Sequence, residues 1–258
     1  MDTSARGLRV LVTAGAAGIG RAIASTFADA GARVFVCDVD EDALTKFRTE
    51  FPALGTTNAD VASPEQVDAM VDGAARFLGG LDVLVNNAGI SGPTAKVEDI
   101  GIADWDRTIA VDLNSMFYCT RRAVPLIKAA GGGSIINLSS VAGRLGYPLR
   151  TPYASAKWAV VGFTKSLAIE LGPSNIRVNA IQPGVVEGER IDRVISAKAQ
   201  ALGLSFEEYR AQFMASVSLG RMVSAADIAN MALYLATPAG RNISGQALSV
   251  CGDHGMLG

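Results

Sequence analysis

Short apolar runs alternate with longer amphipathic segments along this chain. The run over residues 8–13 has the length and composition of a buried strand, and Ile19, Ile23 and Phe27 follow it at the four-residue spacing of one helix face. Further strand-like runs cover residues 34–37, 81–85, 134–138, 176–181 and 248–250, and helix-like segments cover residues 104–129 and 153–171. Alternating strands and helices predict a parallel sheet with helices on both faces. We therefore expect a doubly wound α/β fold with a single sheet of about seven strands.

The residues at predicted helix ends agree with this pattern. Gly31 lies where the first helix should stop, and Ser63, Pro64 and Gln66 begin another helix, with Ser63 and Gln66 as a capping box. No linker rich in Pro or Ser and no tandem repeat divides the sequence, so we expect one domain over residues 1–258. In such a sheet the ligand binds at the carboxyl ends of the strands.

Composition and charge narrow the function classes. Hydrophobic residues make up 49% of the 258 residues and charged residues 19%, which is enough apolar material for a large core and excludes a disordered chain. The formal net charge of -2 argues against a nucleic-acid partner. No apolar run approaches the ~18 residues of a membrane span, and the first residues lack a signal-peptide pattern. We therefore expect a cytoplasmic globule without a membrane partner.

The few cysteines and the single histidine argue against a metal site. Cys37, Cys119 and Cys251 are widely spaced and form no CxxC pair, which predicts neither a disulfide framework nor a thiolate metal cage. His254 has no partner at ligand spacing, so we interpret it as a surface or interface residue.

A glycine-rich turn, GAAGIG at residues 15–20, lies directly between the first predicted strand and the first predicted helix. Glycines there let the backbone approach a pyrophosphate, and the helix N-terminus offers free N–H groups and a positive dipole. Asp38 ends the second strand, where an acidic side chain accepts hydrogen bonds from an adenosine ribose and repels a 2′-phosphate. These features favour NAD over NADP. The alternative is that Asp38 is a solvated carboxylate of an acidic loop.

Several motifs make the chain resemble the short-chain dehydrogenase/reductase family over essentially its whole length. TAGAAGIG at residues 13–20 is similar to the family's TGxxxGxG turn, with Ala14 where the first glycine normally stands. Further matches are NNAG at residues 86–89, Asp60-Val61 as the pair that meets adenine, and Pro183-Gly184 beside the nicotinamide. The resemblance implies a Rossmann-type fold. It also implies an NAD cofactor, because Ala17 stands in the turn where NADP-preferring members often carry a basic residue.

Ser140, Tyr153 and Lys157 are the candidate catalytic residues. Tyr153 and Lys157 are four residues apart and so share one face of a helix, and Ser140 follows the strand that ends near Leu138. Oxidation of a secondary alcohol needs a base for the hydroxyl proton while hydride leaves for the nicotinamide. A free phenol loses its proton only near pH ~10, but a neighbouring ammonium favours the phenolate, and a Ser hydroxyl can hold the substrate oxygen. An ordinary Tyr and Lys on a helix face are the alternative, and the resemblance favours the catalytic interpretation.

The resemblance implies cofactor contacts from the glycine turn, from the ends of later strands and from the catalytic helix. These are Gly15, Ala17, Gly18, Ile19, Gly20, Asp38, Asp60, Val61, Asn87, Ala88, Gly89, Tyr153, Lys157, Pro183, Gly184 and Val186. Two positions depart from the family's pattern. Asp112 stands where an Asn usually helps to hold water in a proton relay through the Lys, and Gly188 stands where many relatives carry a Thr that helps to hold the carboxamide. We expect Asp112 to support the relay and to alter its pH profile.

The segment over residues 185–220 is expected to contact the substrate. It contains two helical patterns, at residues 190–200 and 206–216, and in this family the equivalent segment closes over the substrate. The polar side chains that could face the substrate are Arg144, Tyr147, Arg150, Glu187 and Arg190. The arginines indicate an anionic or polyol substrate, and the default interpretation of each of these five residues alone is a solvated or interface position.

These features predict an oxidoreductase that transfers a hydride between NAD and a secondary alcohol or ketone, such as a sugar, a polyol or a hydroxy acid. A 3-oxoacyl-carrier-protein reductase that uses NADPH is the main alternative, and Asp38 counts against it. A non-catalytic cofactor-binding regulatory protein and a nucleotide-sugar epimerase are more remote alternatives. The resemblance also implies a homotetramer in which the helices around residues 104–129 and 153–171 pack between subunits. Trp105 and Trp158 on those helices are expected at core or interface positions.

Overall fold

A single parallel sheet runs through the centre of this computed structural model, which describes residues 2–255. Its strands are β1 (Arg9–Thr13), β2 (Arg33–Asp38), β3 (Gly55–Asn58), β4 (Val83–Asn86), β5 (Gly133–Leu138), β6 (Ile176–Pro183) and β7 (Ala247–Val250). Their order in the sheet is β3-β2-β1-β4-β5-β6-β7, so the chain reverses direction across the sheet between β1 and β4. This order confirms the predicted doubly wound Rossmann-type fold with seven strands. The crevice for a ligand is expected outside the carboxyl ends of β1 and β4.

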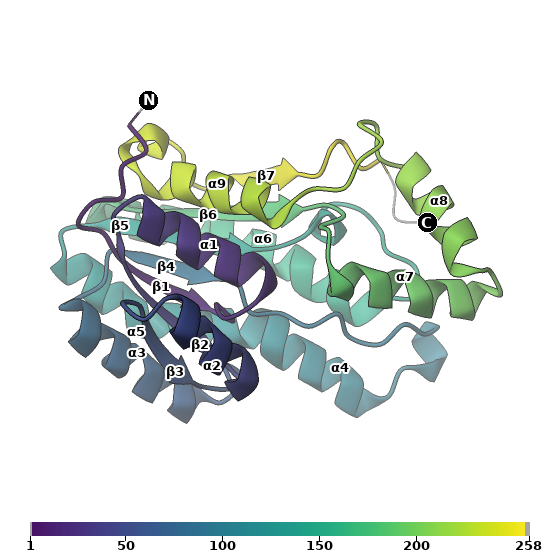
Figure 1. Cartoon of the computed structure of the whole chain (residues 1–258), viewed down its shortest axis with the longest axis horizontal. Coiled ribbons are helices and arrows are strands. Elements are labelled where there is room, and N and C mark those ends of the chain that lie inside the picture. Colours follow the sequence, from purple (N-terminus) through teal and green to yellow (C-terminus); the bar gives the residue numbers. More distant parts are fainter. Residues whose placement is uncertain (1, 256–258) are drawn as a thin grey trace.

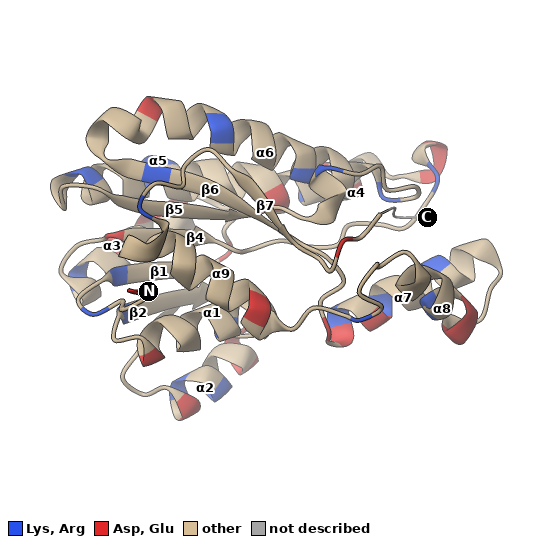
Figure 2. Ribbon diagram, turned by 90° about the horizontal axis from the view of Figure 1, so that it is seen from above, with Lys and Arg blue, Asp and Glu red and all other residues tan. Residues whose placement is uncertain are grey.

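Helices cover both faces of this sheet. The helices α1 (Gly18–Asp29), α2 (Glu41–Glu50) and α9 (Ala225–Ala236) lie on one face, and α3 (Pro64–Leu78), α5 (Ser115–Ala129) and α6 (Thr151–Leu171) lie on the other (Figure 2). Successive residues of β1 therefore enter different cores: Val10 and Val12 pack towards α1, whereas Leu11 packs towards α3 and α5. Burial on both faces explains why the strands are continuous apolar runs rather than alternating ones.

The start of α3 differs in one detail from its predicted capping box. The Ser63 hydroxyl accepts a hydrogen bond from Gln66 N, as predicted, and Pro64 opens the helix. The Gln66 side chain accepts from Asp60 N at 2.9 Å instead of from Ser63 N. The reciprocal half of the predicted box is therefore wrong, because Ser63 N already donates to the Asp60 carbonyl.

The helix predicted over residues 104–129 contains a widened turn. The helix α4 (Ile102–Ile109) continues through a π-helical segment, Ala110–Asn114, into α5. Such π turns are rare in proteins overall, and those that occur are often found at functional sites. Asp112 lies in the middle of this turn.

The helices α7 (Glu189–Leu202) and α8 (Phe206–Ala215) extend beyond the end of the sheet to which the strands point (Figure 1). They correspond to the two helical patterns predicted within residues 185–220. A separate apolar cluster joins them to the β5–α6 connection, and its members include Val141, Val185, Ile195, Tyr209 and Phe213. The two helices thus form one wall at the ligand-binding edge of the sheet.

Within the described residues, no helix is both long and apolar enough to pass through a lipid bilayer, and no cluster of His, Cys, Asp and Glu could hold a metal ion. The three cysteines are buried and free. His254 is fully buried and makes an edge contact with the Phe213 ring at 5.1 Å between centroids. Our interpretation of His254 as a surface or interface residue was therefore wrong, because the chain folds back over α8 after β7.

Candidate functional site

The glycine turn after β1 has a strained first position. Ala14 has φ 49°, in the left-handed region that favours glycine. A Cβ atom at Gly20 would lie 2.0 Å from the Ala14 carbonyl oxygen, so this position must remain glycine. The Asn87 side chain donates to the carbonyls of Thr13 and Ala14 at 2.9 and 3.0 Å. The residue after β4 therefore fixes the turn after β1.

The geometry after β1 and β2 fits the phosphates and ribose of a dinucleotide. Ala17 is the N-cap of α1 and its methyl group cannot cap the helix, which leaves backbone N–H groups for a phosphate. Asp38 is only 9% exposed, and its carboxylate accepts from Ala16 N at 3.1 Å and from Asp40 N at 3.2 Å. It is therefore a fixed negative charge beside the turn and not a solvated loop carboxylate.

The remaining predicted cofactor residues lie along the same edge of the sheet. Asp60 follows β3 and pairs with Arg107 of α4 at 3.1 Å, and Val61 beside it is buried. Pro183 ends β6, and Gly184 N donates to the Val250 carbonyl at 2.9 Å.

The first asparagine of the NNAG motif connects two strands and a helix. Asn86 Nδ2 donates to Asn137 Oδ1 of β5 at 2.8 Å and to Thr120 Oγ1 of α5 at 3.2 Å. Asn137 Nδ2 in turn donates to Thr164 Oγ1 of α6. This polar chain places the helix α6, which carries Tyr153 and Lys157, relative to the strand ends.

Tyr153 and Lys157 lie together at the start of α6. Lys157 is 3% exposed, and its Nζ lies 5.6 Å from the centre of the Tyr153 ring. Lys157 Nζ donates to the Leu138 carbonyl at 3.1 Å, which ties it to the end of β5. Ser140 follows two residues later, and its hydroxyl oxygen accepts from Ala142 N at 3.1 Å, which leaves the hydroxyl hydrogen for another acceptor.

Asp112 forms a buried ion pair with Lys157. Asp112 has no exposed surface; its Oδ1 accepts from Ile90 N at 2.6 Å, and its Oδ2 lies 3.5 Å from Lys157 Nζ. A Cβ atom at Gly89 would lie 3.2 Å from Lys157 Nζ and 3.3 Å from Asp112 Oδ1. The glycine of the NNAG motif thus leaves room for this charge pair. Lys157 thus lies between two of the predicted site residues, with Asp112 and the Tyr153 ring both near its Nζ.

The five polar residues predicted to face the substrate have different surroundings. Arg150 is 2% exposed, and its guanidinium carbon lies 5.3 Å from the ring centres of both Tyr147 and Tyr153. Arg190 Nη1 donates to the Gly89 carbonyl at 3.0 Å and so connects α7 to the NNAG segment. Of the other two, Arg144 donates to the His254 carbonyl, and Glu187 is exposed.

Sequence reasoning missed Lys198 of α7. It is 1% exposed, and its Nζ lies 4.3 Å from the centre of the Tyr147 ring. A signal was present, because Ile191, Ile195, Lys198 and Ala199 follow the spacing of one helix face. A lysine on the apolar face of an amphipathic helix is expected to be buried, and this expectation would have indicated Lys198.

Gly188 explains one departure from the family's pattern. It is the N-cap of α7 with φ 130° and ψ 172°, a conformation that is essentially restricted to glycine. A Thr at this position would be strained, so the hydroxyl that many relatives present here is incompatible with this entry into α7.

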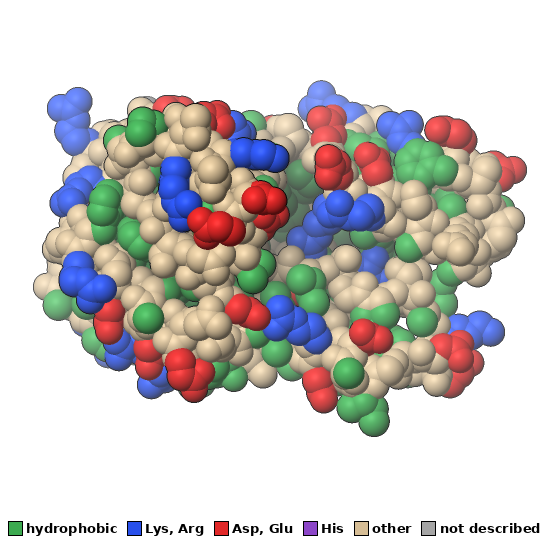
Figure 3. All heavy atoms as spheres, turned by 60° about the horizontal axis from the view of Figure 1, so that its bottom comes forward, with side chains coloured by type: hydrophobic (Ala, Val, Ile, Leu, Met, Phe, Trp, Pro, Cys, Tyr) green, Lys and Arg blue, Asp and Glu red, His purple; other side chains and the backbone are tan. Residues whose placement is uncertain are grey.

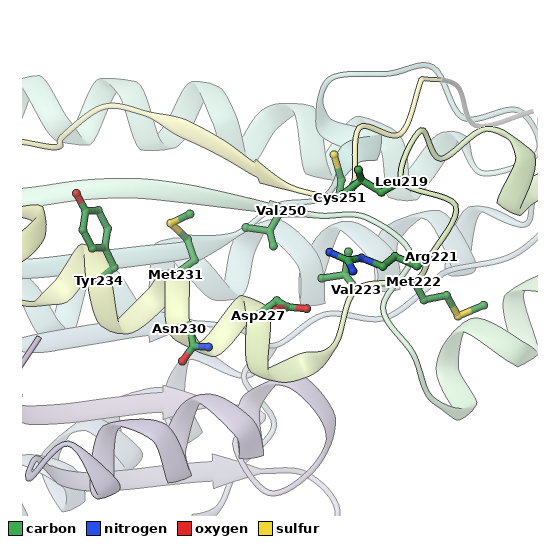
Figure 4. Close-up of a pocket in the computed structure, with 11 residues that line it drawn as sticks. Leu219, Arg221, Met222, Val223, Asp227, Asn230, Met231, Tyr234, Val250 and Cys251 are labelled. Atoms are coloured by element: carbon green, nitrogen blue, oxygen red, sulfur yellow. The ribbon is translucent and has the colours of Figure 1, made fainter.

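Two pockets lie near this edge. A pocket of about 560 Å³ between the residues after β4 and α7 is lined by Ser91, Gly92, Thr94, Arg150, Arg193, Val194, Ala197, Gln200 and Ala201. In the space-filling view a hollow opens in the middle of one face, and Lys and Arg side chains lie along one of its walls (Figure 3). The second pocket, of about 440 Å³, lies between α9 and the end of β7 and contains none of the predicted catalytic residues (Figure 4).

The chain is similar to several known proteins over nearly its whole length. The family profile described as Enoyl-(Acyl carrier protein) reductase matches residues 14–256. Trans-4-hydroxycyclohexanecarboxylate dehydrogenase of Sinomonas cyclohexanicum is 38% identical over 252 residues, which cover 94% of this chain and 90% of the relative. The 7alpha-hydroxysteroid dehydrogenase of Escherichia coli (strain K12) is 36% identical over 246 residues, which cover 94% and 92%. The crystal structure of an actinorhodin polyketide ketoreductase variant with NADPH has a TM-score of 0.92 at 33% identity and covers 99% of both chains.

Proposed function

Because the chain belongs to the short-chain dehydrogenase/reductase family, whose members interconvert alcohols and ketones with a nicotinamide cofactor, we propose that it oxidises a secondary alcohol with NAD and reduces the ketone in reverse. The observation that carries this proposal is the placement of Tyr153 next to the buried Lys157 at the carboxyl edge of the sheet. The bound nicotinamide would accept or supply the hydride.

The side chains at this edge handle the proton and the substrate oxygen. Tyr153 takes the hydroxyl proton during oxidation and returns it during reduction. Ser140 uses its free hydroxyl hydrogen to hold the same oxygen, which stabilises the charge that develops there. Lys157, whose Nζ lies 5.6 Å from the centre of the phenol ring, stabilises the negative charge that develops on the Tyr153 oxygen during proton transfer.

Asp112 positions Lys157, and its negative charge partly offsets the positive charge of the ammonium. In this proposal its carboxylate takes the place of the usual Asn in the proton relay, with Oδ1 held by Ile90 N and Oδ2 facing Lys157. A carboxylate accepts the same hydrogen bonds as an amide oxygen but adds a negative charge. The relay therefore keeps its acceptor and changes its electrostatics.

The preference for NAD rests on Asp38 and Ala17. The Asp38 carboxylate is fixed at the end of β2 and would repel a 2′-phosphate, and Ala17 offers no positive charge to hold one. The likeness to a polyketide ketoreductase crystallised with NADPH supports the second candidate, a ketoacyl reductase. We place that candidate second because it needs the phosphate that Asp38 disfavours.

We also propose that the enzyme is a homotetramer in the cytoplasm. Trp105 of α4, Phe117 of α5 and Trp158 of α6 are exposed, although large apolar side chains favour burial. Packing of these helices between subunits would cover them. Three free, buried cysteines are consistent with a reducing compartment. Light scattering on the purified protein tests the tetramer.

The function is tested by NADH absorbance with NAD or NADP and a panel of sugars, polyols, hydroxy acids, steroids and simple secondary alcohols. We expect turnover with NAD, and we expect Tyr153→Phe to lower kcat by about 100-fold or more, because the general base is lost. Calorimetric titration with NADH should show that Tyr153→Phe still binds the cofactor. Turnover with NADP alone would favour the ketoacyl reductase, and full activity of Tyr153→Phe would exclude the proposed mechanism.

A further inference from the structure

Two buried cations, Arg150 and Lys198, lie against the Tyr147 ring without an anionic partner, and Arg150 also lies against the Tyr153 ring. Arg150 is 2% exposed and Lys198 is 1% exposed. Neither forms an ion pair with any carboxylate of residues 2–255. Charged side chains are almost never fully buried unless they are paired, and an unpaired buried charge destabilises the folded state. This arrangement requires a reason.

The contacts of Arg150 leave much of its guanidinium unused. Nη2 donates to the Ser91 carbonyl, and Nε is buried without a hydrogen-bond partner in the described part of the chain. The group lies against the faces of Tyr147 and Tyr153, which position it but accept none of its hydrogen bonds. A guanidinium with free N–H groups suits the two oxygens of a carboxylate.

Lys198 of α7 approaches one of these tyrosines, Tyr147, and also Tyr209. Its Nζ lies 4.3 Å from the Tyr147 ring centre and 6.0 Å from that of Tyr209. Cation–π contacts of this kind offset only part of the cost of removing an ammonium from water. Arg150 and Lys198 therefore share contact with the Tyr147 ring, and Arg150 acts electrostatically on Lys198, so that the two cations add to the same positive potential.

This positive region opens to a pocket at Arg150. Arg150 lines the pocket of about 560 Å³ between the residues after β4 and α7, and that volume suits a small-molecule ligand. Arg193 lines the same pocket, but its exposed side chain pairs with Glu189 at 3.6 Å. An anion that enters the pocket meets Arg150 next to Tyr153.

We propose that the substrate carries a carboxylate group, which Arg150 and Lys198 bind while its hydroxyl carbon lies at Tyr153. This inference rests on the proposed function and narrows it to hydroxy acids and the corresponding keto acids. The carboxylate supplies the missing negative charge, and its position relative to Tyr153 selects which hydroxyl is oxidised.

Binding can be measured without turnover. Acetate, butyrate and cyclohexanecarboxylate, each beside its amide, are added to the NADH-bound protein at matched ionic strength, and the affinity is measured by calorimetry and thermal shift. We expect at least one carboxylate to bind more tightly than its amide. We expect Lys198→Met to lower the affinity for that carboxylate by about tenfold or more, because hydrogen bonds to charged groups are strong. The affinity for the amide should stay unchanged. Lys198→Arg should restore binding.

The exposed Lys128 of α5 provides the matched control, because Lys128→Met removes the same charge far from the pocket. A purely structural role for Lys198 predicts that Lys198→Met affects acid and amide equally, and that result would overturn the inference, as would failure of every carboxylate to bind better than its amide. If the wild-type enzyme oxidises neutral alcohols but no hydroxy acid, this inference fails and the proposed function stands. If it oxidises nothing, the proposed function fails, and the binding experiment still decides on the anion site.

The pH dependence of binding gives a second readout. Burial, and then Arg150, lowers the pKa of Lys198 to about 8. The phenols facing it, Tyr147 and Tyr209, have pKa values raised by burial and stay neutral. We therefore expect carboxylate binding to weaken as the pH rises above about 8 in the wild type and to vary less in Lys198→Met.

Discussion

At the scale of single residues, Ala14 shows how a family motif can be kept in shape while its sequence changes. Its φ of 49° is one that glycine adopts freely and that a Cβ atom disfavours. Asn87 holds the Ala14 carbonyl by a hydrogen bond, so the neighbouring motif keeps the turn in place despite the strain. The departure therefore affects stability more than the geometry of the turn.

Replacing this residue by glycine should stabilise the protein. The left-handed conformation costs an Ala about 1–2 kcal/mol, which the Gly variant recovers in its free energy of unfolding. The added conformational freedom of the unfolded Gly variant offsets about half of this gain. We expect Ala14→Gly to raise Tm by about 1–3 °C in thermal unfolding. Ala53 is the control, since it lies in an exposed turn without a positive φ, and Ala53→Gly should lower Tm. An equal decrease in Tm for Ala14→Gly and Ala53→Gly would show that the backbone at Ala14 is not strained.

At the scale of secondary-structure elements, the sequence predicted the strands and helices that have a clear hydrophobic pattern. The runs at residues 8–13, 34–37 and 134–138 became β1, β2 and β5 with small changes at their ends, because buried parallel strands are nearly all apolar. The π turn over Ala110–Asn114 could not be predicted, since five ordinary helix-compatible residues do not indicate a widened turn. The helix α9 was also missed, because its Ala-rich sequence gives only a weak amphipathic pattern.

In the candidate site, too, local sequence patterns indicated some residues, whereas others depend on contacts between distant segments. Ser140, Tyr153, Lys157 and Asp112 could be found because fixed spacings place them on known elements. The spacing of α7 could have shown that Lys198 lies on an apolar helix face, but not what it contacts, since Tyr147 and Arg150 are far away in sequence. Contacts between distant segments are decided by tertiary packing and not by local pattern.

The π turn gives Asp112 its position and leads to a test of the relay. In Asp112→Asn the ammonium of Lys157 loses its carboxylate neighbour, so its full charge acts on the Tyr153 phenol. We expect the curve of kcat/KM against pH for alcohol oxidation to rise at lower pH than in the wild type. Asp68→Asn removes a carboxylate from exposed surface ion pairs and should leave the curve in place. An unchanged curve in Asp112→Asn would exclude a role in the relay.

At the scale of the whole molecule, the buried ammonium of Lys198 links stability to pH. Its pKa is lowered from 10.5 to about 8 in the folded state, so between these values the unfolded chain binds more protons than the folded one. The cost of the buried charge is present below pH 8 and is relieved as the pH rises towards 10.5. The binding site is thus a local instability in the absence of an anion.

This link predicts opposite effects of one substitution on stability and on binding. We expect Lys198→Met to be more stable than the wild type at pH 7 in urea unfolding, and this difference to shrink between pH 8 and 10. Lys128→Met should follow the wild-type profile at every pH. Parallel profiles for Lys198→Met and the wild type would show that the charge is not buried at a cost.

The overhang of α7 and α8 beyond the sheet has a further consequence for the lifetime of the protein. These helices are attached through their own apolar cluster, and that cluster packs around the two cations. Segments held by few contacts open locally before the rest of a protein unfolds, and proteases cleave what opens. A ligand that neutralises Arg150 and Lys198 would keep this segment closed, so the amount of enzyme that survives in a cell would follow the supply of its substrate.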